Sequence, residues 1–214
     1  MKPTLARKIF CIAALFCAAA WNANANQVAD PGFEGSTDNI GGNPFSSSWT
    51  VVPANDPFSG VGGDSAFAHS GTNYAFLGAT PNTATLSQAG GVSTVATQSY
   101  SLSFWLANDI TAGLPATNSF NVFFNGVNVF SLTNSAAFGY TQFTISNLVA
   151  TGASTALQFV YRHDSDFWRL DDVNVSPQGV PEAFSTMLLA FPAFGALGLV
   201  HFSRARARKS LARI

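Results

Sequence analysis

Short runs of alternating apolar and polar residues fill the middle of the chain, and long helical periods are few. Over residues 100–106 the apolar positions are two apart, and Trp105 lies on the opposite face of the predicted strand. A similar run at 120–124 is followed by Asn125-Gly126 and a second apolar run. Both turn residues tolerate positive φ, so this segment predicts a β-hairpin.

Three further segments, at 140–148, 155–161 and 170–175, predict additional strands. Gly, Ser, Thr and Asn fill the intervals between them, as is common for turns. The pattern predicts an all-β domain over residues 26–177, built as an antiparallel β-sandwich, most simply a jelly roll. A domain of roughly 150 residues can bury enough surface to fold from its own core.

The N-terminal residues 1–25 have the three parts of a secretory signal peptide. Lys2, Arg7 and Lys8 form the positive region, and residues 9–20 are an apolar stretch of 12 residues. Ala23-Asn24-Ala25 then offers the small residues that signal peptidase requires, so the mature chain is expected to begin at Asn26. The alternative is an uncleaved N-terminal anchor, for which the apolar stretch is short.

The other end of the chain predicts one transmembrane helix. Residues 183–203 are apolar and carry no charge. At 1.5 Å per residue, a helix of this length spans ~30 Å, the thickness of the hydrocarbon core of a bilayer. Residues 204–214 are basic, which predicts that they stay in the cytoplasm as a stop-transfer signal. The basic cluster consists of Arg204, Arg206, Arg208 and Lys209.

Charge is distributed unevenly along the chain. Residues 26–179 contain ten acidic side chains against only Arg162 and Arg169, a net charge of −8. A nucleic-acid partner is therefore not expected, because such binding needs a basic surface. Both cysteines, Cys11 and Cys17, lie in the predicted signal peptide, so the mature domain has neither a disulfide nor a reactive thiol.

Short motifs at the two ends of the β-domain resemble the galactose-binding-like jelly rolls, which include many carbohydrate-binding modules. The domain opens with Asp30-Pro31-Gly32-Phe33-Glu34 and closes with Leu170-Asp171-Asp172-Val173. The resemblance covers about residues 28–176, with Asp30 where the family commonly has Asn. It implies that the opening segment and the closing strand lie side by side.

In that family, the opening Glu and the first closing Asp often help to bind a structural Ca²⁺. The matching residues are Glu34 and Asp171. Their carboxylates are hard oxygen ligands of the kind that Ca²⁺ prefers. Two alternatives remain for Asp171, which could instead cap a loop or pair with Arg162 or Arg169, while Glu34 would be solvated.

Carbohydrate binding needs exposed aromatic rings on which sugars can stack. The candidates are Trp49, Trp105 and Trp168, although a Trp is more often packed in a core. Catalysis is not expected, because His69 and His163 have no metal-ligand spacing and no nucleophile motif is present. The sequence therefore predicts a non-enzymatic domain.

The C-terminal tail resembles the PEP-CTERM sorting signal of Gram-negative, exopolysaccharide-making bacteria. Residues 178–182 form a spacer and the Val180-Pro181-Glu182 element, with Ala183 where the second Pro is usual. The resemblance implies processing by exosortase, a membrane protease-transpeptidase. The alternative is an ordinary single-pass anchor with a chance Pro-Glu before it.

These features together predict an exported protein of the cell envelope or extracellular matrix. Its precursor would be anchored in the inner membrane and then reach the cell surface or the medium. Exopolysaccharide, including that of a biofilm matrix, is the expected ligand of the β-sandwich. A permanently anchored periplasmic binding module and a secreted carbohydrate-active hydrolase are the alternative functions.

Overall fold

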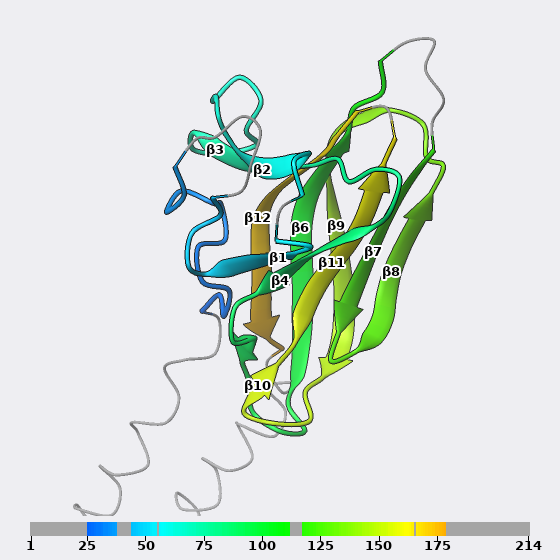
Figure 1. Ribbon diagram of the computed structural model, residues 1–214. Helices are drawn as coiled ribbons and strands as arrows, with labels where there is room; N and C mark the ends of the chain where they lie inside the picture. Colours follow the sequence, from blue (N-terminus) through cyan, green and yellow to red (C-terminus); the bar gives the residue numbers. More distant parts are fainter. Residues whose placement is uncertain (1–24, 38–43, 55, 112–116, 165, 179–214) are drawn as a thin grey trace, which may run out of the picture. The chain divides into compact units, whose positions relative to one another are not determined.

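A computed structural model describes residues 25–37, 44–54, 56–111, 117–164 and 166–178, and within these ranges the protein consists of β-strands (Figure 1). The strands are β1 (Trp49–Val52), β2 (Ser59–Gly63), β3 (Asn73–Leu77), β4 (Ala84–Gln88), β5 (Val92–Ser93), β6 (Ser99–Asn108), β7 (Asn118–Phe124), β8 (Val127–Thr133), β9 (Phe138–Val149), β10 (Ser154–Thr155), β11 (Leu157–His163) and β12 (Trp168–Pro177).

Two five-stranded sheets form the sandwich. One has the order β1-β4-β11-β7-β8 and the other β2-β3-β12-β6-β9, while β5 and β10 pair separately. Every pairing in the described chain is antiparallel. The predicted all-β antiparallel sandwich is therefore confirmed.

The predicted hairpin is the connection between β7 and β8. Asn125 and Gly126 have φ values of 54° and 75°, the left-handed conformation that such a turn requires. Phe124 and Val127 are the last residue pair before this turn.

Phe104 lies at the centre of the core between the sheets. Its side chain is fully buried, and four other aromatic rings surround it, with centroids 5.5–6.0 Å away. These rings belong to Phe120, Phe130, Phe143 and Phe159. Because they come from both sheets, the same cluster fixes how the two layers stack.

The opening segment of the domain lies beside the closing strand, as the resemblance implied. The N–H of Gln27 donates to the carbonyl of Val175 (2.8 Å), and the N–H of Val173 donates to that of Pro31 (3.0 Å). The opening segment thus borders β12 where its pairing with β3 has ended.

Within the part of the chain that the structure describes, no helix is long and apolar enough to cross a membrane. The predicted signal-peptide segment to residue 24, the sorting element at 180–182, the span 183–203 and the basic tail lie outside the described residues. Gln178, predicted to begin the spacer, is described. Its backbone N–H donates to Ser99, and its side chain accepts from the N–H of Asn147, so this residue is fastened to the domain.

Candidate functional site

The three tryptophans predicted to stack on sugars occupy different environments. Trp49 and Trp168 are buried in the core, where their indole N–H groups donate to the carbonyls of Asp30 and Arg162. The prediction that these two rings contact a glycan is therefore corrected, because neither presents a face to solvent. Trp105 is half-buried and, as its alternation predicted, lies on the face opposite the buried Phe104.

The exposed side of Trp105 is covered by a histidine. The imidazole of His69 lies nearly parallel to the indole, with ring centroids 3.8 Å apart and planes 16° apart. Nδ1 of His69 lies 2.6 Å from a carboxylate oxygen of Asp172, and the ring of Tyr140 meets the imidazole edge-on. Ser70 donates to the same Asp172 carboxylate rather than to His69, so these residues do not form a hydrolase triad.

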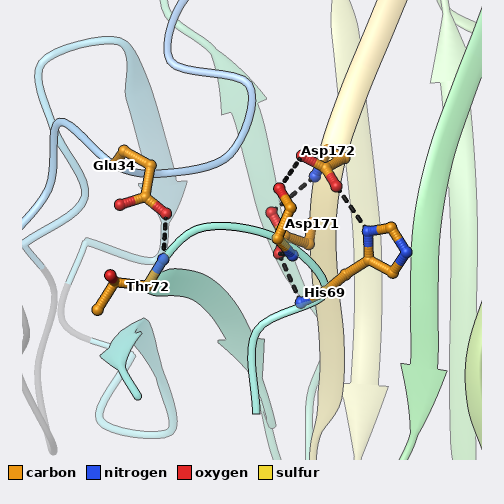
Figure 2. Close-up of polar contacts among 6 residues, drawn as sticks. Glu34, His69, Thr72, Asp171 and Asp172 are labelled. Atoms are coloured by element: carbon orange, nitrogen blue, oxygen red, sulfur yellow. Dashed lines mark hydrogen bonds and ion pairs between the residues drawn. The ribbon is translucent and has the colours of Figure 1, made fainter. Parts of the chain in front are cut away.

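His69 belongs to the connection between β2 and β3, residues 64–72, which we call the cover loop. Figure 2 shows how carboxylates from elsewhere in the domain hold it. One oxygen of Asp171 accepts the backbone N–H groups of His69 (2.9 Å) and Ser70 (3.2 Å). Glu34 accepts the N–H groups of Thr72 (2.7 Å) and Asn73 (2.9 Å).

The predicted calcium ligands are Glu34 and Asp171. Both carboxylates accept hydrogen bonds from backbone N–H groups in or next to the cover loop. For Asp171, this is the loop-capping alternative. Arg162 pairs with Asp164, and Arg169 pairs with Asp109, so neither arginine is its ion-pair partner. Burial is the main cause that raises the pKa of Asp171 to about 6, and the nearby charge of Asp172 adds to the shift.

The carboxylate oxygens in this region are still the kind of ligand that a hard cation such as Ca²⁺ prefers. A Cβ placed on Gly32 would lie 3.6 Å from an oxygen of both Asp171 and Asp172 and 3.9 Å from Cγ of Glu34, so three acidic side chains gather there. Nevertheless, the described residues contain no group of three or more His, Cys, Asp or Glu side chains arranged to hold a metal ion. Bound Ca²⁺ would need backbone carbonyls as additional ligands.

Arg169 lies on β12 two residues before Asp171, and its guanidinium donates to the carbonyl of Phe67 in the cover loop. Its guanidinium lies 5.2 Å from the ring centroid of Phe67 and 5.7 Å from that of Tyr140. It also forms an ion pair with Asp109 at 2.5 Å. Its Nε and the hydroxyl of Tyr140 are buried and have no hydrogen-bond partner among the described residues. Burial raises the pKa of Tyr140, so its hydroxyl stays protonated.

An open pocket of about 450 Å³ adjoins Arg169. Asp109, Asp166 and Arg169 supply charged groups to its wall, and Phe138 supplies an aromatic surface. Thr111 donates to one oxygen of Asp166 (2.8 Å). The pocket therefore combines carboxylate acceptors, a guanidinium donor and a ring, which is the chemistry that sugar hydroxyls and sugar C–H faces require.

Sequence reasoning did not identify this pocket. Arg169 was considered only as a possible partner of Asp171. One signal was present, because Asp109 is the sole Asp, Glu, Lys or Arg between Asp64 and Arg162. In the structure this isolated charge pairs with Arg169.

Comparison with known proteins relates the fold to carbohydrate-binding modules. No protein-family model matches the chain, and no curated protein matches it. The structure is similar to that of the module TmCBM61 in complex with β-1,4-galactotriose, with a TM-score of 0.52 and 17% identity, covering 72% of this chain and 99% of that one.

Two xylan-related structures are also similar. One is the CBM22-1 and GH10 part of Clostridium thermocellum xylanase 10B complexed with xylohexaose, with a TM-score of 0.49 and 11% identity, covering 75% of this chain and 29% of that one. The other is the CBM22-1 xylan-binding domain of Paenibacillus barcinonensis Xyn10C, with a TM-score of 0.43 and 15% identity, covering 76% and 100%. The likeness is one of fold, a jelly-roll β-sandwich.

Proposed function

We propose that the β-sandwich is a non-enzymatic module that binds a polysaccharide through the pocket beside Arg169. The observation that carries this proposal is the convergence of Asp109, Asp166 and Arg169 with the ring of Phe138 on one open pocket. Its volume of about 450 Å³ lies in the range typical of small-molecule sites. The fold shared with a galactotriose-binding module supports the same ligand class.

The pocket carboxylates have roles that a binding site explains. Asp109 holds Arg169 in place, and one oxygen of Asp166 accepts a hydrogen bond from Thr111 while the carboxylate lines the pocket. A sugar with neighbouring hydroxyls could donate to Asp166 and accept from Arg169 at the same time. Charge-assisted hydrogen bonds of this kind contribute about 1.5–3 kcal/mol each.

Asp166→Asn is expected to weaken polysaccharide binding about tenfold, since it removes the charge from one acceptor while keeping its shape. Affinity electrophoresis against immobilised galactan, xylan, mannan and glucan measures the effect. Asp64→Asn is the matched control, because Asp64 is exposed on the cover loop and does not line the pocket. Equal loss in both variants, or none in Asp166→Asn, would contradict the assignment of the pocket.

We further propose that the chain is exported and sorted through its C-terminal signal, with signal peptidase and an exosortase-type protease as partners. Support comes from the sequence, where an export signal, a Pro-Glu element, an apolar span and a basic end occur together. The intact mass of the protein in cells and in medium tests this. A form from Asn26 to about Glu182 is expected, whereas a membrane form retaining Ile214 would indicate a permanently anchored periplasmic module.

Calcium is also proposed as a structural ligand near Glu34 and Asp171. Millimolar CaCl₂ is expected to raise the thermal unfolding temperature relative to EDTA by about 5–10 °C if its concentration is about 100 times the Kd. The physical reason is that the cation would offset the repulsion among the acids around Gly32. MgCl₂ at the same concentration is the control. Identical thermal unfolding curves in CaCl₂ and EDTA would contradict calcium binding. Glu34 and Asp171 would then act only as acceptors for backbone N–H groups.

A further inference from the structure

The stacking of His69 on Trp105 occupies a surface that a sugar could use. A pyranose ring packs its C–H face parallel to an indole, and the imidazole lies parallel at a centroid distance of 3.8 Å and an angle of 16°. Among the three tryptophans of the β-sandwich, Trp105 is the one that is not buried. Its outward face is therefore filled by a residue of the same chain.

Trp105 is a neighbour of the proposed sugar pocket. On β12 its partner is Asp171, and two residues further along β6 the partner of Ala107 is Arg169, which lines the pocket. Two residues of a strand span about 7 Å, a distance comparable to one sugar ring. A polysaccharide chain leaving the pocket along β6 would reach Trp105 next, and would meet His69 there.

The cover loop is attached in a way that permits its displacement without breaking a sheet. Its residues lie between β2 and β3, and side chains make its hydrogen bonds to the rest of the domain. Asp171 and Asp172 hold His69, Glu34 holds Thr72, and Arg169 donates to the carbonyl of Phe67 (3.3 Å). Losing the His69 contacts would therefore leave every strand pairing in the described domain intact.

We propose that Trp105 is a second sugar-stacking subsite and that His69 is a removable cap over it. The inference rests on the proposed polysaccharide-binding function and adds its regulation. A short sugar fills the pocket while the cap stays in place. A longer chain extends over Trp105 only when the imidazole swings away, so the cap lowers the affinity for long chains specifically.

The test compares xylohexaose and a β-1,4-galactan hexasaccharide with their disaccharides, using calorimetry on the full chain. His69→Ala is expected to bind a hexasaccharide about five to ten times more tightly than the natural chain, with little change for the disaccharide. The double variant His69→Ala/Trp105→Ala should lose this gain. Ser65→Ala, an exposed cover-loop residue away from Trp105, should bind like the natural chain.

Acrylamide quenching of tryptophan fluorescence gives a second readout that needs no sugar. Trp49 and Trp168 are buried, so removing the cap should increase quenching through Trp105. Asp172→Asn, which removes the charged partner of His69 and keeps the imidazole, should show an intermediate increase. If His69→Ala does not fold, Asp172→Asn provides the test of whether His69 shields Trp105.

The outcomes separate the two proposals. Unchanged or weaker hexasaccharide binding by His69→Ala, or a gain that survives the loss of Trp105, would overturn the cap. If neither the natural chain nor any variant binds a glycan, the proposed function fails. Quenching would then still show whether His69 shields the ring, and an unchanged value in His69→Ala would overturn that shielding as well.

Discussion

Changing Pro181 and Glu182 together to alanine is expected to abolish C-terminal processing and to leave the full tail on the membrane-associated protein. The expected effect is complete because the Pro-Glu element is the part of the tail that the sorting enzyme is proposed to recognise. The alanines keep the length, the apolar span and the basic end, so membrane insertion should be unchanged. Intact mass of the membrane and medium fractions measures the result.

The position of Gln178 in the fold bears on the proposed cleavage. Gln178 is fastened to the domain through Ser99 and Asn147, so the proposed recognition element begins shortly after a residue that the fold holds in place. Three residues from Gln178 to Pro181 span at most about 10–11 Å when fully extended. If the tail is cut as proposed, the enzyme that recognises Pro181 acts within about 10–11 Å of Gln178, which follows β12.

A matched control separates recognition from access. Replacing Gly179 with alanine changes the same short segment and leaves Pro181 and Glu182 in place, and it should be processed normally. If the double alanine variant is cut as efficiently as the natural chain, the sorting proposal is wrong. If the natural chain itself retains Ile214, the tail is an ordinary anchor, and the double variant will look the same as the natural chain.

Among the strands predicted from the sequence, β7 and β11 have burial that alternates along their whole length. In β6, Tyr100, Leu102, Phe104 and Leu106 are all buried, and the residues between them face outward. Strand β2 was missed because its sequence, Ser-Gly-Val-Gly-Gly, has no alternation. The reason is local packing, since a Cβ on Gly62 would lie 2.5 Å from the ring of Tyr74 on the neighbouring strand.

The candidate site could be predicted only in part, because it is made by contacts between distant residues. Alternation placed Trp105 on the outer face, but nothing local indicates that His69, 36 positions earlier, would cover it. Nor does the sequence show that Asp109, which follows β6, forms an ion pair with Arg169 on β12. Trp49 and Trp168 were candidates by residue type alone, which does not distinguish a ring packed in the core from one on the surface.

Asp171 is expected to make the stability of the domain depend on pH. Burial raises the pKa of this carboxyl to about 6, against about 3.9 for an Asp in an unfolded chain. Between these values the folded protein keeps a proton that the unfolded chain has released. The free energy of unfolding should therefore fall as the pH rises from about 4 to about 6, by about 3 kcal/mol at most, and this contribution should then stay constant.

The groups around Asp171 have opposite effects on the pKa of its carboxyl. Its oxygens accept N–H groups from His69, Ser70 and Asp172, which favours the ionised form, while burial and the charge of Asp172 disfavour it. The expected direction follows from burial as the largest cause. Because Asp171 holds the backbone of His69, the same pH range should also change how firmly the cover loop is attached.

Asp171→Asn should remove this pH dependence, since an amide does not titrate. At pH 7 the variant should also be less stable by about 1–3 kcal/mol, because the amide nitrogen cannot accept the backbone N–H groups. Urea unfolding of both proteins at pH 4, 5, 6 and 7 in EDTA measures the two effects without calcium. Asp64→Asn is the control, and its curve should run parallel to that of the natural chain. If the free energy of unfolding of Asp171→Asn also varies with pH in parallel with that of the natural chain, Asp171 does not titrate in this range. Any pH dependence of the cover loop would then come from other groups.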